Sequence, residues 1–415
     1  MTEIKKENKN MSNVPNLRFP EFKGEWEVKK LGDLSELITK GTTPKKFVSQ
    51  GIKFIKIECF DGDTIDLQKC LFIEEQIHNK ELKRSILKEN DLLFAIAGAT
   101  IGKINIIKGD ILPANTNQAL AIIRLKEKEN SKFIYQILKS EIMQRYIKDS
   151  ISVGAQPNLN LEQMNNFSFF YPSLSEQQKL SSFLSLIDKR IQTQNKIIEE
   201  LKILKATLSH KIFSRQLRFQ DDNGKEFCDW EIKKLGDLVK FCKGSNLSKG
   251  DISIQGQIKC IHYGELFTIY NEVISSVISR TNNVGFYSNI GDILMPSSDV
   301  TPLGLATAST ILENGVILGG DINVLRPSVK INSIFLSYLI NYEKKKIIEL
   351  VSGTTIKHIY SKDLKVIKLN IPNSVDEQTK IAEFLSQIDK KVETEKQLLT
   401  QYENQKKYLL QNLFI

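Results

Sequence analysis

The chain has 415 residues, enough for two or three domains that each bury a core. Its 58 basic and 49 acidic residues give a net charge of +9, which suits a nucleic-acid partner, and no apolar run is long enough to span a bilayer. The five cysteines include no C-x-x-C motif and their number is odd, which argues against a disulfide framework and favours a reducing cytoplasm.

The chain begins with a polar stretch, MTEIKKENKN, that lacks the apolar core of a signal peptide. We expect residues 1–20 to form a disordered leader. The phrase EWEVKKLGDL follows at residues 25–34 and returns as DWEIKKLGDL at residues 229–238, an offset of 204. A repeated phrase indicates that a whole structural unit is duplicated.

Residues 21–172 are expected to form the first globular domain. Apolar runs at 52–60, 91–107 and 118–125 are punctuated by glycines and predict strands. Residues 132–148 have apolar side chains at helical spacing and predict one helix.

Residues 173–214 predict a single long helix, which we expect to recur at residues 373–415. Pro172 and Pro372 precede the two copies, and Ser173 with Glu176, like Ser374 with Glu377, has the spacing of a capping box. Neither copy contains an internal Pro or Gly, so each helix can extend over roughly 60 Å at 1.5 Å per residue. The offset between the copies is 201 residues.

Both helices carry an apolar seam with a 3.5-residue repeat, which favours a coiled coil. The seams are interrupted at matching places, by Gln194 and Glu395 and by Lys205 and Lys406, which could fix the register. The natural partner of each helix is the other copy, although two amphipathic helices packed separately on their own domains are the alternative. An antiparallel pair would return the C-terminus to the start of the first domain.

Residues 215–372 are expected to form the second globular domain. Strands are predicted at 257–263, 291–295, 307–312 and 322–325, followed by one helix at 333–351. Taken together, the chain predicts an α+β fold in which two domains of mixed α/β type, related by an internal repeat, are joined by two long helices forming an antiparallel coiled coil. The interiors of the two domains barely match, which suggests one scaffold with two specificities.

These features resemble the specificity subunit of type I restriction-modification enzymes over essentially the whole chain after the leader. The resemblance is carried by the repeated W-E-x-K-K-L-G-D-L phrase, by Gly41-Thr42-Thr43-Pro44, and by the repeated P-x-x-x-E-Q-x-K-[LI]-x-x-F-L-S-x-I-D-K phrase. The second unit departs from it, with Gly244-Ser245-Asn246-Leu247 in place of Gly41-Thr42-Thr43-Pro44, so an equal role of the two loops cannot be assumed.

The resemblance implies two target recognition domains that each read one half of a bipartite double-stranded DNA site, with the helices setting the spacing. It also implies that two methyltransferase subunits dock on the helices and that restriction subunits join them. S-adenosylmethionine, ATP and Mg would then be bound by those partner subunits, and this chain would bind no cofactor of its own.

Catalytic machinery is not recognisable in the sequence. The chain has no Pro-Pro or Asn-Pro with which an amino-methyltransferase grips a flipped base, and no G-x-G-x-x-G. The four histidines are scattered, and the pair Cys260 and His262 is too small a set for a zinc site. We therefore expect a non-catalytic protein without a metal site.

DNA recognition requires Lys, Arg and loop amides for phosphates and polar side chains for base edges. Each candidate residue has a solvated turn as its alternative role. The candidates are Lys40, Thr42, Thr43, Lys45, Lys46, Thr100, Lys103, Asn115, Asn117 and Gln118 in the first domain, and Lys243, Ser245, Asn246, Lys249, Ser297, Ser298, Thr301 and Arg326 in the second.

Docking of two identical partners predicts identical residues on the outward faces of the two helices. The candidates for partner docking are Gln177, Gln178, Phe183, Asp188, Gln378, Phe384 and Asp389. A competing hypothesis of another class is a coiled-coil scaffold whose globular domains bind proteins. It predicts binding that is indifferent to salt, whereas phosphate contacts make affinity fall steeply with salt.

Overall fold

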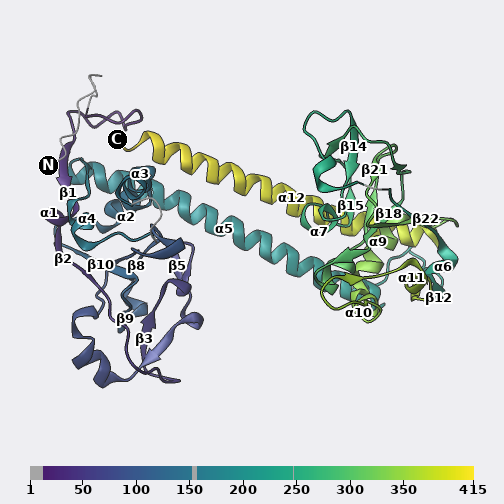
Figure 1. Cartoon of the computed structure of the whole chain (residues 1–415), viewed down its shortest axis with the longest axis horizontal. Coiled ribbons are helices and arrows are strands. Elements are labelled where there is room, and N and C mark those ends of the chain that lie inside the picture. Colours follow the sequence, from purple (N-terminus) through teal and green to yellow (C-terminus); the bar gives the residue numbers. More distant parts are fainter. Residues whose placement is uncertain (1–12, 152–156, 246) are drawn as a thin grey trace. The chain divides into compact units, whose positions relative to one another are not determined.

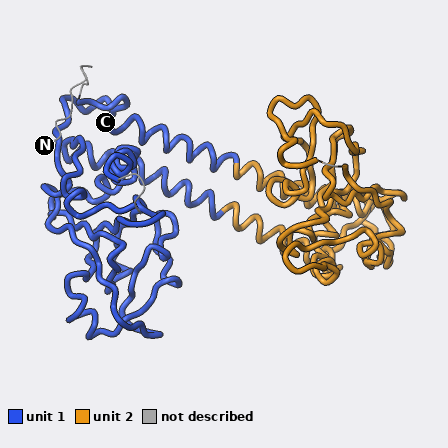
Figure 2. The backbone as a smooth tube through the Cα atoms, viewed as in Figure 1, with its two compact units in different colours: residues 1–196, 397–415 blue, residues 197–396 orange. Residues whose placement is uncertain are grey.

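The computed structural model describes residues 13–151, 157–245 and 247–415. The chain divides into two compact units (Figure 2). Unit 1 comprises residues 1–196 and 397–415, and unit 2 comprises residues 197–396. Each unit therefore contains one globular domain and one part of each long helix.

The globular domain of unit 1 is built mainly from short strands, followed by three helices and a last strand (Figure 1). Its elements are β1 Glu27–Lys30, α1 Leu31–Leu34, β2 Ser35–Lys40, β3 Ile52–Ile55, β4 Phe60–Asp61, β5 Thr64–Ile65, β6 Leu71–Ile73, β7 Leu92–Ala95, β8 Ile104–Ile106, β9 Ala114–Thr116, β10 Leu120–Leu125, α2 Ser131–Lys139, α3 Glu141–Ser150, α4 Leu161–Asn166 and β11 Ser168–Tyr171.

Unit 2 follows a similar order, with more and shorter strands and with the additional short helices α7 and α8 among them. Its elements are β12 Trp230–Lys234, α6 Leu235–Leu238, β13 Val239–Lys243, β14 Ile258–Ile261, α7 Glu265–Thr268, β15 Val273–Ile274, β16 Arg280–Thr281, β17 Phe286–Tyr287, β18 Ile293–Pro296, β19 Ser298–Asp299, α8 Pro302–Leu305, β20 Ser309–Ile311, β21 Ile317–Leu318, β22 Ile322–Pro327, α9 Ser333–Tyr342, α10 Lys344–Ile348, β23 Lys357–His358, α11 Ser361–Lys365 and β24 Lys368–Pro372.

The sheets of the two units share a common order of strands, to which unit 2 adds β15 in the main sheet and β17 in the second. In unit 1 the order is β2-β10-β7-β8, and in unit 2 it is β13-β22-β18-β20-β15. A second sheet in each unit contains one parallel pair, β3 with β9 in unit 1 and β14 with β21 in unit 2. The internal repeat seen in the sequence is thus a repeat of topology, including the parts whose sequences diverge.

The repeated W-E-x-K-K phrase forms a strand that pairs with the strand leading into a long helix. β1 pairs with β11 in unit 1, and β12 pairs with β24 in unit 2, both antiparallel. The glycine after each phrase lies against a neighbouring helix, because a Cβ on Gly32 would be 2.8 Å from Asn165 Oδ1 and one on Gly236 would be 3.1 Å from Lys365 Cβ. The phrase is therefore repeated because it anchors the start of each helix.

The predicted long helices are confirmed as α5, Leu174–Phe213, and α12, Val375–Asn412. A serine precedes each helix, and its Oγ accepts a backbone N–H of the first turn. The Glu176 N–H donates to Ser173 and the Glu377 N–H donates to Ser374, both at 3.4 Å. In unit 1 the segments of α5 and α12 run antiparallel, because Asp188 pairs with Lys406 while Arg190, two residues further along α5, stacks on Tyr402, four residues earlier in α12. In unit 2, Lys205 of α5 pairs with Asp389 of α12.

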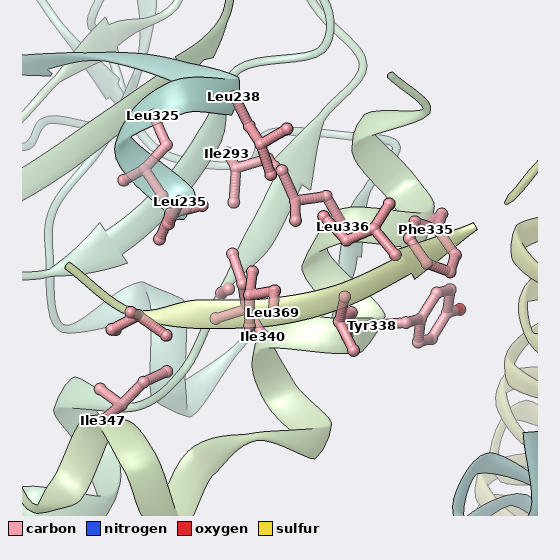
Figure 3. Close-up of a cluster of buried hydrophobic side chains, with 14 of the residues drawn as sticks. Leu235, Leu238, Ile293, Leu325, Phe335, Leu336, Tyr338, Ile340, Ile347 and Leu369 are labelled. Atoms are coloured by element: carbon pink, nitrogen blue, oxygen red, sulfur yellow. The ribbon is translucent and has the colours of Figure 1, made fainter. Parts of the chain in front are cut away.

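The core of unit 2 lies between its main sheet, α9 and β24 (Figure 3). Ile293 and Leu325 come from the sheet, Phe335 and Leu336 from α9, and Leu369 from β24. The corresponding core of unit 1 gathers Trp26, Phe133 and Leu184, and Phe414 packs edge-to-face on Phe133 with ring centroids 5.8 Å apart. The C-terminus is therefore part of the first unit, as the antiparallel pairing predicts.

Two predictions about local structure are wrong. The leader was expected to extend to residue 20, but Leu17 donates its backbone N–H to the Asn412 carbonyl at 2.9 Å, and Arg18 and Phe19 contact α5. Residues 1–12 lie outside the described part of the chain. Each predicted single helix before the long helices is two helices, because Ser140 is extended, with φ −73° and ψ 167°, and Glu343 leaves the helical range.

Among the described residues, no helix is both long and apolar enough to cross a lipid bilayer.

Candidate nucleic-acid interface

A glycine follows the first strand of the main sheet in both units, and neither position has room for a side chain. A Cβ on Gly41 would lie 2.1 Å from the Thr116 carbonyl oxygen, and one on Gly244 would lie 1.9 Å from the Gly319 carbonyl oxygen. Contacts under 3.0 Å cannot be accommodated against backbone atoms. The two glycines hold the chain against a neighbouring turn of the same unit.

The hydrogen bonds around these glycines are equivalent in the two units. Gly41 donates to the Leu120 carbonyl at 3.2 Å, and Gly244 donates to the Ile322 carbonyl at 3.1 Å. We call residues 40–43 with 117–119 the glycine-turn site of unit 1, and residues 243–245 with 319–321 the glycine-turn site of unit 2. Although GTTP and GSNL differ in sequence, their first residues have the same backbone role; Asn246 itself lies outside the described residues.

The glycine-turn site of unit 1 brings together five of the predicted DNA-binding residues. They are Lys40, Thr42, Thr43, Asn117 and Gln118. Thr43 hydrogen-bonds Gln118, and Asn117 Oδ1 accepts the Ala119 N–H at 3.2 Å. Sequence reasoning missed Arg84, which donates to Thr42 Oγ1 from Nε at 3.3 Å and from Nη2 at 3.2 Å. This site is cationic and rich in hydrogen-bonding groups.

The glycine-turn site of unit 2 opens into a cavity of about 540 Å³. The predicted residues Lys243 and Lys249 line it, together with Ser248, His262 and Asp321, which sequence reasoning missed or set aside. Cations, a histidine and a carboxylate therefore face one hollow, a combination that can contact both phosphates and base edges.

His262 is held in one tautomer by its neighbours. Its Nδ1 accepts the Gly264 backbone N–H at 3.2 Å, so in the neutral ring the proton is on Nε2. Burial lowers the pKa of His262, and Lys249 lowers it further, against the opposing effect of Glu265 and Asp321. The ring is therefore neutral at physiological pH and presents an N–H donor.

The remaining predicted cations and hydroxyls are distributed over other loops. Lys45, Lys46 and Lys103 are exposed, and Lys46 is 4.0 Å from Glu74. Thr100 is in the turn between β7 and β8. In unit 2, Ser298 Oγ lies 3.0 Å from His358 Nδ1 and 3.4 Å from Asp321 Oδ1, which places Ser298 beside the glycine-turn site.

Ser297 and Thr301 have internal roles in this loop. Ser297 is 9% exposed and donates its backbone N–H to the Asp321 carbonyl, and Thr301 caps α8 while bonding Asp299 at 2.7 Å. Their side chains are therefore weaker candidates for DNA contact than Ser298.

Three predicted DNA-binding residues have internal partners in the structure. Asn115 is fully buried and bonds His78, the Leu82 carbonyl and Ser85. Ser245 Oγ accepts the Phe286 N–H at 2.8 Å, so it holds the turn. The Arg326 guanidinium binds both oxygens of the buried Asp292, at 2.8 and 2.7 Å.

The Arg326 pair has an equivalent in unit 1. Arg124 binds both oxygens of Asp91 at 2.9 and 2.7 Å, and Asp91 is 1% exposed. Each arginine is in the main-sheet strand that comes last in the chain, β10 or β22, and each aspartate directly precedes the neighbouring strand, β7 or β18. The pair therefore belongs to the scaffold.

Most of the predicted docking residues make internal contacts that are the same in both units. Gln177 and Gln378 are buried, and each donates Nε2 to the carbonyl of the proline that precedes its helix, at 2.8 and 2.9 Å. Phe183 packs edge-to-face on Phe19 with centroids 5.7 Å apart. Phe384 packs on Phe219 at 5.6 Å in the same way. Only Gln178, among these candidates, is exposed.

A second repeated phrase accounts for these contacts and was missed in the sequence. Leu17-Arg18-Phe19 recurs as Leu217-Arg218-Phe219. The arginine of each copy pairs with the buried glutamate in the first turn of a long helix, Arg18 with Glu176 at 2.8 Å and Arg218 with Glu377 at 3.2 Å. In a capping box the glutamate side chain would accept the backbone N–H of the serine. Here each glutamate binds an arginine instead, and in unit 2 Glu377 also accepts the Trp230 indole N–H at 3.1 Å.

Asp188 and Asp389 were expected on outward faces, but each pairs with a seam lysine of the opposite helix. Lys205 lies 2.7 Å from Asp389 and 2.9 Å from Glu272 of the globular domain. In unit 1, Lys406 pairs with Asp188 and lies 3.9 Å from Asp63. We call these groups the lysine nodes.

The lysine nodes differ in composition. The node of unit 1 also contains Lys139, which pairs with Asp63, and Tyr135, whose hydroxyl donates to Asp63 at 2.8 Å. In unit 2 the Tyr338 hydroxyl donates to Asp389 at 2.5 Å. Burial alone would lower the pKa of Lys205, but Glu272 and Asp389 outweigh it, so that pKa lies above its usual value.

Within residues 13–151, 157–245 and 247–415, no group of three or more His, Cys, Asp or Glu side chains is arranged to hold a metal ion.

Known proteins share both the sequence pattern and the fold. A family model described as the type I restriction modification DNA specificity domain matches residues 23–203 and 228–404. The type I restriction enzyme MjaVIII specificity subunit of Methanocaldococcus jannaschii is 25% identical over 433 residues, covering 97% of this chain and 94% of that protein. The type I restriction enzyme EcoBI specificity subunit of Escherichia coli is 28% identical over 187 residues, 43% of this chain and 38% of that protein.

Among solved structures, the type I restriction-modification system S subunit from M. genitalium matches with a TM-score of 0.58 and 17% identity, over 97% of this chain and 99% of that one. The fold described above is therefore shared with that subunit.

Proposed function

This chain belongs to the type I restriction-modification DNA specificity family, and from that premise we propose that each unit reads one half of a bipartite site in double-stranded DNA. The chain supplies recognition and assembly, and the chemistry belongs to its partners. The two long helices, each of which contributes residues to both units, set the gap between the halves.

One observation supports the proposal above the others. The glycine-turn sites have the same backbone in both units, yet they present Thr42, Thr43 and Gln118 in one and Asp321, with His262 in the adjoining cavity, in the other. A scaffold that is constant while its exposed polar groups change is what two readers of different sequences need, because base edges are distinguished by their donor and acceptor patterns.

Cations are present at both sites for the phosphate backbone. Lys40 and Lys243 precede the equivalent glycines, and Arg84 and Lys249 stand beside them. Phosphate contacts supply most of the affinity of such proteins and make it depend on salt. The dissociation constant should therefore rise steeply as salt is added, which separates DNA reading from a protein-binding scaffold.

The partners we propose are two methyltransferase subunits, which dock on exposed parts of the helices, and restriction subunits. They would carry S-adenosylmethionine, ATP and Mg. Of the residues predicted for docking, Gln178 stays a candidate, because the other six have internal contacts that account for their repetition.

The test is a base-resolution map of methylated adenine in cells that make this chain with its methyltransferase, compared with cells that lack the chain. We expect a split motif with two different halves and a fixed gap, present only when the chain is made. An unchanged methylation pattern, with binding that is indifferent to salt, would instead support a protein scaffold.

A further inference from the structure

The glycine-turn site of unit 2 contains a carboxylate that its counterpart in unit 1 lacks. Gly244 donates its N–H to Ile322, the first residue of β22, and Gly41 donates to Leu120, the first residue of β10, so these two positions are equivalent. The residue directly before them is Asp321 in unit 2 and Ala119 in unit 1. The two turns therefore share a backbone, and alanine is compatible with it. This is the one acidic side chain on the wall of the unit 2 cavity.

Asp321 is placed to make a contact outside the chain. It is exposed, and among the described residues its carboxylate has one side-chain hydrogen bond, from Ser298 Oγ to Oδ1 at 3.4 Å. Lys243 and Lys249 line the same cavity without an ion pair to it. A carboxylate that is not neutralised is a poor choice for a surface that only follows phosphates, since it repels them. Its presence needs another reason.

Base recognition supplies that reason. In the major groove a carboxylate can only accept, so it can bind the exocyclic amino group of cytosine or adenine, whereas guanine and thymine present acceptors at the same edge. The neighbouring His262 lines the same cavity, and in the neutral ring its N–H donor is Nε2, because Nδ1 accepts the Gly264 N–H. An acceptor next to a donor matches the amino group and the adjacent acceptor of a base pair.

We infer that Asp321, with His262 beside it, is a specificity-determining residue of unit 2, and that it selects adenine or cytosine over guanine or thymine at one position of one half-site. The inference rests on the proposed function and deepens it. Ser298 donates a hydrogen bond to the carboxylate, and Lys243 and Lys249, which line the same cavity, contact the phosphates.

The experiment uses the full chain assembled with its methyltransferase subunits and a library of DNA duplexes in which each base of the bipartite site is randomised in turn. Bound duplexes are sequenced for the wild type, Asp321→Ala and Asp321→Asn. Asp321→Ala installs the residue found at the equivalent position of unit 1, so the turn should keep its fold. Thermal unfolding of each variant checks that it does.

We expect the wild type to prefer adenine or cytosine at one position of one half-site by roughly 5- to 150-fold, the range for one good base contact. Asp321→Ala should remove that preference and leave the other half-site unchanged. Asp321→Asn, whose amide binds adenine well, should shift the preference toward adenine.

Two control variants assign the effect to the right unit. Gln118→Ala, in the glycine-turn site of unit 1, should change the other half-site only. Asp237→Ala removes an exposed carboxylate of unit 2 from α6 and should change neither half-site.

An unaltered base profile in Asp321→Ala, or a uniform loss of affinity without a change of profile, would overturn the inference. So would a wild-type preference for guanine or thymine at the position that the variant relaxes. A wild type that selects no bipartite site at all would instead count against the proposed function.

Discussion

Replacement of the seam lysines Lys406 and Lys205 by methionine, one at a time, should destabilise the two units unequally. The node of unit 1 contains Asp63, Asp188, Lys139 and Lys406, so its charges balance. The node of unit 2 has one lysine, Lys205, for the two carboxylates Glu272 and Asp389. Lys406→Met leaves one unbalanced negative charge, while Lys205→Met leaves two carboxylates with no cation.

The structure gives the expected size of each effect. The side chains of Lys406 and Asp188 are 14% and 11% exposed, and those of Lys205 and Asp389 are 18% and 24% exposed, so solvent screens these pairs little. Removing one partner of a buried ion pair costs about 3–5 kcal/mol. We expect Lys406→Met to fall near the lower end of that range, because Lys139 remains, and Lys205→Met near the upper end.

The chain carries its own reporter for each unit. It has two tryptophans, Trp26 in unit 1 and Trp230 in unit 2, and both are buried. Urea unfolding followed by fluorescence, with one tryptophan replaced by phenylalanine in each background, reads the free energy of unfolding of one unit at a time.

A double variant separates charge from packing. Replacing Lys406 together with Asp188 by apolar residues of similar size should cost much less than Lys406→Met alone, because no unpaired carboxylate is left on the helix. If both single variants cost less than about 1 kcal/mol, the lysines behave as exposed surface pairs and the reasoning fails. Equal losses in the two units would refute the role assigned to Lys139.

The two units should also respond differently to acid. Burial would raise the pKa of Asp63, but Lys139 and Lys406 outweigh burial, and the pKa lies below its usual value. The ionised Asp63 therefore stabilises unit 1 above the unfolded pKa of 3.8, and this stabilisation is lost as the pH falls through the folded pKa. Burial raises the pKa of Asp389, so the contribution of Asp389 to the free energy of unfolding of unit 2 declines instead as the pH rises from 3.8. Asp63→Asn should remove the loss of stability at low pH that Trp26 fluorescence reports for unit 1, and leave the Trp230 signal of unit 2 unchanged. Gly41→Ala and Gly244→Ala should each cost about 1–3 kcal/mol or more from overpacking, whereas Gly250→Ala, whose nearest neighbour would be 3.6 Å away, should stay within about 0.5 kcal/mol in the same fluorescence assay. Seven residues added to both long helices lengthen each by about 10 Å, which should widen the gap in the methylated motif by roughly three base pairs at 3.4 Å each; an unchanged gap would exclude the helices as its determinant.

Sequence reasoning predicted the long helices well because their signals are local. Proline before each helix, serine caps and the absence of internal glycine and proline determine where a helix begins and how far it extends. The shorter helices were less accurate, since apolar spacing continues through Ser140 although the backbone there is extended.

Identity between the two copies, from which we predicted partner docking, also has an internal cause. Asp188 and Asp389 are identical because each binds a lysine on the opposite helix of its unit, and such a pairing leaves no trace in either segment alone. The clue was available in Lys205 and Lys406, which interrupt the seams at matching places and need buried counter-charges.

The DNA-reading candidates were partly misplaced because residue type does not reveal direction. Arg326 and Asn115 have suitable chemistry, but Arg326 binds Asp292 and Asn115 is bonded to the Leu82 carbonyl inside the core. Asp91 and Asp292 begin similar strands, and their match to Arg124 and Arg326 could have identified a scaffold pair. His262 and Asp321 had no such signal, since only folding brings them together.

The arginine, phenylalanine and glutamine contacts at the start of each helix are the same in both units, whereas the exposed Gln118 and Asp321 at the glycine-turn sites differ, and among the described residues each side chain has one hydrogen bond. Selection for a new target sequence therefore acts where the free energy of unfolding is little affected. If these sites read DNA as we propose, a lineage carrying this architecture changes one half of its recognised sequence by substitution in these loops, while the contacts that begin each helix are inherited unaltered.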